Sequence, residues 1–181
     1  MSRFDPSDTF TSRDEHLVAI DSRIDRFGYT MQHIICHVPG CEPLTNTIGL
    51  VDHGQPEFVV SSVCGQSAAI ALSSLAGDVL DGRRFEPSSE FDLLGLRVRL
   101  ALVDRRHWQT GKFGVWVDYY RSIGNHRRPR ALQVLPVPEK WPNEARAMGR
   151  AWCERQERLD IPPFTRGNRR TKQPKRRSTE N

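Results

Sequence analysis

The sequence predicts an α+β protein: a single, mostly antiparallel sheet of about five strands with helices packed mainly on one face. Two segments carry this prediction. Residues 66–80 repeat apolar side chains at helical spacing, whereas residues 94–103 alternate apolar and polar side chains with the period of two of a half-exposed strand. The strand-like segments of the first half also follow one another directly, which favours antiparallel pairing over a β-α-β arrangement.

The first predicted element is a helix from residue 12 to about residue 27. Ser12 and Glu15 have the spacing of a capping box, and Gly28 follows the last turn, where a glycine commonly ends a helix. Three strands come next, each a short apolar or β-branched run bounded by turn residues: 29–38, 45–50 and 57–63.

The second half predicts helices and strands in alternation. The helix over 66–80 is followed by Gly82, and Pro162-Pro163 stops the last helix. The remaining elements are a strand over 94–103, a helix over 113–123, a strand over 130–135 and a helix over 143–159. The predicted order is therefore α-β-β-β-α-β-α-β-α.

Charge divides the 181 residues into three predicted parts. Residues 165–181 hold seven basic residues, one acid and no large apolar side chain, which predicts a disordered basic tail. The rest of the chain has 20 basic and 21 acidic residues, so the net charge of +5 comes from the tail. We expect an N-terminal arm over 1–11 and a single globular domain over 12–164.

The composition predicts a cytoplasmic protein that does not enter a membrane. The N-terminus has no apolar stretch of the kind found in signal peptides. No apolar run approaches the ~20 residues that span a bilayer. The four cysteines of such a chain are expected to be reduced thiols.

Several short motifs occur in a fixed order: Asn46-Thr47-Ile48-Gly49-Leu50, Pro56-Glu57, a central helix ending near Gly82, Leu132-Gln133-Val134-Leu135-Pro136, and Trp141-Pro142. Together they resemble a bacterial family catalogued as domain of unknown function family 4262, over residues 24–159. The chain departs from the family pattern at Asn46, Gln55 and Val137. The resemblance implies a shared scaffold, but the family name implies no activity.

Four residues of these motifs are candidates for a ligand site: Thr47, Gly49, Glu57 and Gln133. A glycine inside a strand marks a bulge or a close backbone approach, beside which Thr47 and Glu57 could line a cleft. The leading interpretation is a non-enzymatic module that binds a small ligand or a protein partner. The alternative is structural, with Glu57 accepting backbone hydrogen bonds and Gln133 bridging two strands.

Basic segments suggest a second function, as a nucleic-acid-binding or ribosome-associated protein. Two Arg-rich loops flank the third helix, and aromatic residues near them (Trp108, Trp116, Tyr119, Tyr120) could stack on bases. The candidate contacts are Arg105, Arg106, Arg127 and Arg128 in the loops, and Arg169, Arg170, Lys172, Lys175, Arg176 and Arg177 in the tail. The alternative is that these charges are solvated surface.

A hydrolase-like enzyme is the third function considered. Cys64 precedes the central helix, whose N-terminus would stabilise a thiolate, but the sequence places no base beside it. Metal binding around His33 and His37 is disfavoured, because two residues four apart on a strand lie about 13 Å apart. We therefore predict no catalytic residue, no metal and no cofactor.

The tail generates a quantitative prediction. Each phosphate that a protein neutralises on duplex DNA contributes about −0.9 to the slope of log affinity against log salt concentration. If about five of the seven cations engage, the slope should be roughly −4 to −5. Truncation after Phe164 should abolish this binding in a low-salt polyanion titration. Equal binding by both forms would assign the contact to the Arg105–Trp108 and Arg127–Arg130 loops instead.

Overall fold

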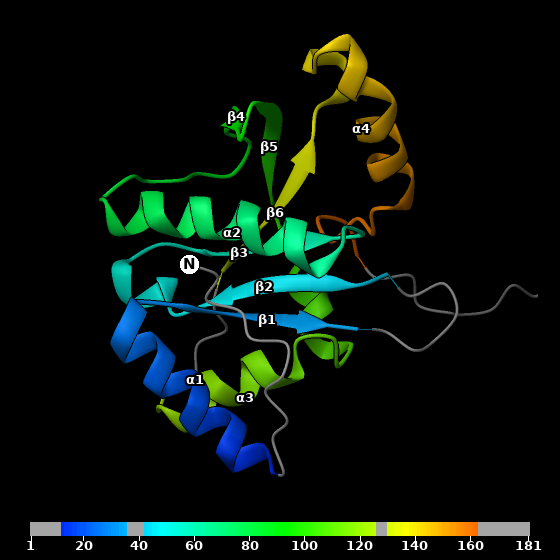
Figure 1. The fold of residues 1–181 in the computed structure, drawn as a ribbon. Coiled ribbons are helices and arrows are strands. Elements are labelled where there is room, and N and C mark those ends of the chain that lie inside the picture. The colour runs from blue at the N-terminus through cyan, green and yellow to red at the C-terminus, as the bar shows by residue number, and fades with distance from the viewer. Residues whose placement is uncertain (1–11, 36–41, 126–129, 163–181) are drawn as a thin grey trace, which may run out of the picture.

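The computed structural model describes residues 12–35, 42–125 and 130–162 (Figure 1). Its helices are α1 (Arg13–Phe27), α2 (Gly65–Leu80), α3 (Gly114–Ser122) and α4 (Asn143–Arg155). Its strands are β1 (Thr30–Ile34), β2 (Leu44–Ile48), β3 (Glu57–Ser61), β4 (Glu90–Leu93), β5 (Leu96–Leu102) and β6 (Ala131–Pro136). They form one sheet of order β1-β2-β3-β6-β5-β4, in which the β3–β6 pair is parallel and the other pairs are antiparallel. The α+β prediction is confirmed, with one strand more than expected.

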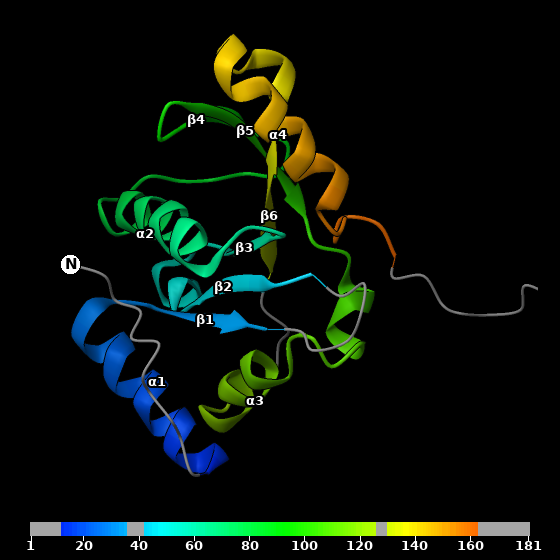
Figure 2. The same cartoon turned by 45° about the vertical axis from the view of Figure 1, so that its right-hand side comes forward.

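Helices cover both faces of the sheet, which differs from the expected arrangement on mainly one face. Helices α2 and α4 lie on one side, and α1 and α3 on the other (Figures 1 and 2). The reason is visible in β3: Phe58 and Val60 join the core under α2, whereas Val59 joins the core formed with α1 and α3. Because the central strands are apolar on both faces, both faces need a cover.

Both predicted ends of the first helix agree with the structure. Ser12 Oγ accepts a hydrogen bond from Glu15 N at 3.2 Å, and Gly28 ends α1 with a φ of 78°. Helix α4 ends at Arg155, four residues before the predicted end. There the buried side chain of Gln156 donates to Val134 O at 2.8 Å, so the chain leaves the helix and returns to the sheet.

The segment predicted as one strand over 94–103 contains a turn. Leu94 and Gly95 have φ values of 53° and 79°, and Leu93 pairs with Leu96, as in a two-residue type I′ hairpin. The strand therefore begins at Leu96, and β4 before the turn was missed. The turn was missed because the alternation of apolar residues continues through it. A leucine is also not a residue that marks a turn in a sequence.

Some predictions lie outside the described residues. These are the N-terminal arm, the end of the first predicted strand with His37, Arg127 and Arg128, and the basic tail. Within the described ranges, no helix combines the length and the apolar character that a membrane crossing requires.

The hairpin turn yields a stability prediction. A non-glycine residue held at a positive φ costs on the order of 1 kcal/mol, and asparagine tolerates this conformation far better than leucine. We expect Leu94→Asn to raise the free energy of unfolding by about 0.5–1 kcal/mol in urea denaturation. Gly95→Ala is the control and should lower it. A destabilised Leu94→Asn variant would mean that the leucine side chain contributes more to packing than its conformation costs.

Candidate functional site

A fully buried carboxyl group, that of Glu57, lies where β3 begins. Its Oε1 accepts hydrogen bonds from Gly49 N at 2.9 Å and Val51 N at 3.3 Å, and its Oε2 accepts one from Thr47 Oγ1 at 2.6 Å. The hydroxyl of Tyr120, on α3, also donates to Oε1. Four donors from three parts of the chain therefore converge on one carboxyl group.

Gly49 makes this geometry possible. Its φ of 114° lets the chain turn from β2 into a short 3₁₀ helix, Leu50–His53, so that backbone N–H groups point at Glu57. A Cβ atom at this position would lie 3.1 Å from Ile24 Cγ1 and 3.2 Å from Gly28 O. Both the conformation and the close approach to α1 require glycine.

Thr47 completes the end of the β2–β3 ladder. The paired register ends at Asn46 and Val59, and Thr47 Oγ1 accepts the next hydrogen bond, from Phe58 N at 2.8 Å. One hydroxyl thus accepts from the backbone and donates to Glu57. This use of both its donor and its acceptor capacity is typical of a structural group.

Burial raises the pKa of Glu57, because a charge is poorly solvated in the protein interior, and the hydrogen bonds that the carboxyl accepts lower it to a lesser degree. Burial also raises the pKa of Tyr120, and the adjacent charge of Glu57 acts in the same direction. The phenol therefore stays protonated and serves as a permanent donor to the carboxyl group.

Gln133 uses its hydrogen bonds elsewhere. Its Nε2 donates to Glu157 O at 2.6 Å, and its Oε1 accepts from Leu159 N at 2.7 Å. These bonds attach the segment after α4 to the centre of the sheet, and Gln133 shares no hydrogen-bond partner with Glu57. The structure thus brings together Thr47, Gly49 and Glu57 but not Gln133. Ligand binding by these four residues stays a prediction, and their hydrogen bonds fit the structural alternative.

The first Arg-rich loop presents cations without aromatic platforms. Arg105 is exposed, and Arg106 is held by Asp104 through Nε and Nη2, both at 3.0 Å. The four aromatic side chains proposed to stack on bases are all buried: Trp108, Trp116, Tyr119 and Tyr120. Base stacking by these rings is therefore excluded in this fold.

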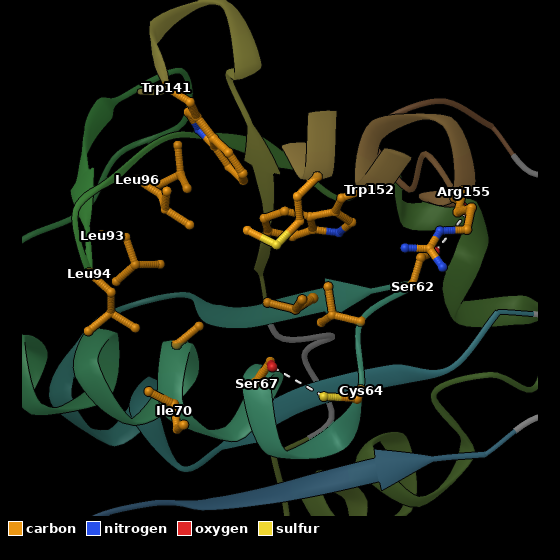
Figure 3. Close-up of a pocket in the computed structure, with 15 residues that line it drawn as sticks. Ser62, Cys64, Ser67, Ile70, Leu93, Leu94, Leu96, Trp141, Trp152 and Arg155 are labelled. Carbon is orange, nitrogen blue, oxygen red and sulfur yellow. Dashed lines mark hydrogen bonds between the residues drawn. The ribbon is translucent and has the colours of Figure 1, made fainter. Parts of the chain in front are cut away.

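A different feature has the form of a ligand site. A cavity of about 560 Å³ lies between α2, the β4–β5 hairpin and α4 (Figure 3). Leu93, Leu94, Leu96 and Trp141 lie at one end, and Ser62 and Arg155 lie at the other. The cavity is therefore apolar at one end and polar at the other.

Two indole rings form fixed walls of this cavity. Trp141 Nε1 donates to Arg97 O at 2.6 Å, and Trp152 Nε1 donates to Ser61 O at 2.9 Å. Gly149 lets α4 pack on Trp141, because a Cβ atom there would lie 2.7 Å from Trp141 Cε3. With both N–H groups bonded to the sheet, the rings can offer a ligand only their apolar faces and edges.

Cys64 lines the cavity at the start of α2. Hydrogen bonding with the Ser67 hydroxyl and with backbone N–H groups lowers the pKa of its thiol. The ring of His33 lies close by, since a Cβ atom at Gly65 would be 3.2 Å from His33 Nε2. In the described part of the chain, however, the thiol's hydrogen-bond partner is Ser67 Oγ, at 3.1 Å, so no nucleophile–base pair is formed.

Within the described ranges, no three His, Cys, Asp or Glu side chains come together in a way that could hold a metal ion. His33 Nδ1 instead shares a hydrogen bond with Thr45 Oγ1, at 2.7 Å.

Comparison with protein families gives a match over residues 23–147, to the family described as "Domain of unknown function (DUF4262)". The chain belongs to this family. The resemblance inferred from the motifs is confirmed. Searches of curated proteins and of solved structures found no match to this DUF4262 protein.

Part of the cavity lies beyond the matched DUF4262 segment. Trp152 and Arg155 follow residue 147, whereas the walls from α2 and the hairpin lie within the match. Sequence reasoning missed these two residues. One signal was present: Met148 and Trp152 are four residues apart on a largely polar helix, a spacing that puts both on one face.

The Glu57 cluster of the DUF4262 domain predicts a pH-dependent stability. A raised pKa means that the folded state binds this proton more tightly, so wild-type stability falls as pH rises above the unfolded pKa. The free energy of unfolding of the wild type minus that of Glu57→Gln should therefore decrease as pH rises above about 4.5. Urea denaturation at several pH values measures it.

Matched variants separate charge from packing. Glu57→Ala should cost about 2–5 kcal/mol, because it leaves several buried donors unpaired. The exposed Glu86→Gln is the control and should change little. A wild-type to Glu57→Gln difference that is constant across pH would contradict a raised pKa.

Proposed function

We propose that this DUF4262 protein is a non-enzymatic binding module whose small-molecule ligand occupies the cavity between α2, the β4–β5 hairpin and α4. The observation that carries the proposal is the cavity itself. Its volume of about 560 Å³ falls within the range of small-molecule pockets, about 300–1,000 Å³. Its mainly apolar walls with a few polar groups are also typical of such sites.

Exposed apolar side chains at the cavity support ligand binding. Ile70 of α2 is 53% exposed, and Leu94 of the hairpin and Met148 of α4 are each 59% exposed. All three line the same cavity although they come from three separate elements. Apolar surface gathered in this way gains about 25 cal/mol per Å² when a ligand removes it from water.

The fixed walls also favour binding. The indole N–H bonds of Trp141 and Trp152 hold these side chains in place before a ligand arrives. A preformed site loses less side-chain entropy on binding than a flexible one. The proposal includes the cytoplasmic location expected from the composition.

Nucleic-acid binding is not favoured by a specific observation in the described residues. Arg106 is paired with Asp104, and the nearby aromatic rings are buried. Truncation of the tail tests that function separately from the cavity.

The proposal is tested with N-phenyl-1-naphthylamine, a neutral apolar probe whose fluorescence rises in apolar pockets. Wild-type protein should bind it, and Ala71→Phe should weaken binding at least tenfold, because Ala71 lines the cavity and phenylalanine would fill it. Ala147→Phe is the matched control: it places the same ring on an exposed position of α4 that does not line the cavity.

Thermal unfolding establishes that each variant is folded. If Ala71→Phe unfolds, Met148→Glu replaces it, since Met148 is an exposed residue of the same cavity. Absence of probe binding to the wild type, or equal binding by folded cavity variants, would overturn the proposal.

A further inference from the structure

The apolar and polar side chains that line the cavity lie at opposite ends of it. Figure 3 shows Trp141 and Leu96 at the end where the hairpin meets α4, and Ser62 and Arg155 at the opposite end. The lining contains one charged side chain, that of Arg155, and no acid. A ligand in this cavity would therefore meet apolar surface along most of its length and a single positive charge at one end.

We infer that the ligand is an amphipathic anion: an apolar chain or ring with one terminal carboxylate, which Arg155 binds. This inference rests on the proposed function. A guanidinium group has a planar fork of N–H donors that matches a carboxylate. The opposite, apolar end of the cavity receives the body of the ligand.

The guanidinium of Arg155 is available for this contact. Its Nε donates to Ala151 O at 3.1 Å, and within the described ranges no carboxylate pairs with it. The cations nearby differ. Arg158 is paired with Asp160 at 2.5 Å, and Lys112 is paired with Glu157. Unlike these two cations, Arg155 keeps its Nη groups available for a ligand.

The backbone around Arg155 is fixed by the polar end of the cavity. Ser62, at a φ of 64° after β3, donates from its Oγ to Arg155 O at 2.8 Å. This bond joins the end of α4 to the end of β3. It uses the Ser62 hydroxyl proton, which leaves the guanidinium as the stronger donor for an anion at this end.

Leu94 provides independent support for the apolar end. It occupies a turn position with a φ of 53°, where asparagine or glycine is preferred, and its side chain is largely exposed. Residues held in such conformations cluster at ligand-binding sites. A leucine kept there at a local energetic cost is explained if its side chain contacts the apolar part of the ligand.

The test compares octanoate with octanol, which share a chain length and differ in charge, by isothermal titration calorimetry. Wild-type protein should bind octanoate about tenfold more tightly, as expected for one charge-assisted contact. Arg155→Gln should remove this preference and leave octanol binding unchanged. Arg150→Gln is the matched control: it alters an exposed arginine of the same helix that does not line the cavity.

Two further measurements probe the two ends of the cavity. Added NaCl should weaken octanoate binding but not octanol binding, because salt screens only the charged contact. Leu94→Asn should weaken both ligands about threefold, since it shortens the apolar wall.

The outcomes distinguish the two proposals. Equal binding of octanoate and octanol by the wild type would overturn the anion inference and leave the small-molecule site intact. A preference for octanoate that survives Arg155→Gln would overturn the assignment to Arg155. Failure of the wild type to bind the neutral naphthylamine probe would overturn the proposed function itself.

Discussion

One buried carboxyl group connects the parts of this fold. Glu57 opens the central strand β3, and its hydrogen bonds reach the turn after β2 and the phenol of α3. A buried acid is tolerated only when donors surround it, so its presence dictates what its neighbours must be. Gly49 has to turn the backbone N–H groups inward, Thr47 has to supply a hydroxyl, and Tyr120 has to reach across from the other layer.

The two-sided sheet explains where a binding site can form. Helices α1 and α3 close one face around buried aromatic side chains. On the other face α2 and α4 stand apart, and the β4–β5 hairpin lies beside the space between them (Figures 2 and 3). The cavity is thus a consequence of incomplete coverage, and it is stabilised by two tryptophans whose indole N–H groups donate to the sheet.

The elements that were predicted correctly from the sequence are those that a local pattern determines. Capping residues located α1, and the apolar stripe located α2 within one residue of its start. The motif residues Thr47, Gly49 and Glu57 were recognised as a group, but Tyr120 was not, because its link to Glu57 spans 63 positions. The turn at Leu94 and the site of Arg155 depend on tertiary packing, which no local spacing encodes.

The parallel pairing of β3 with β6 has a consequence for the order of folding. It divides the sheet into two antiparallel halves, β1-β2-β3 and β6-β5-β4, each built from comparatively near neighbours in the chain. The seam between them pairs Glu57 with Ala131, so its formation closes a long loop. Closing such a loop carries an entropic cost that is recovered only after contact. The two halves are therefore expected to form first. The pairing of β3 with β6, at the centre of the finished sheet, is then expected to form last.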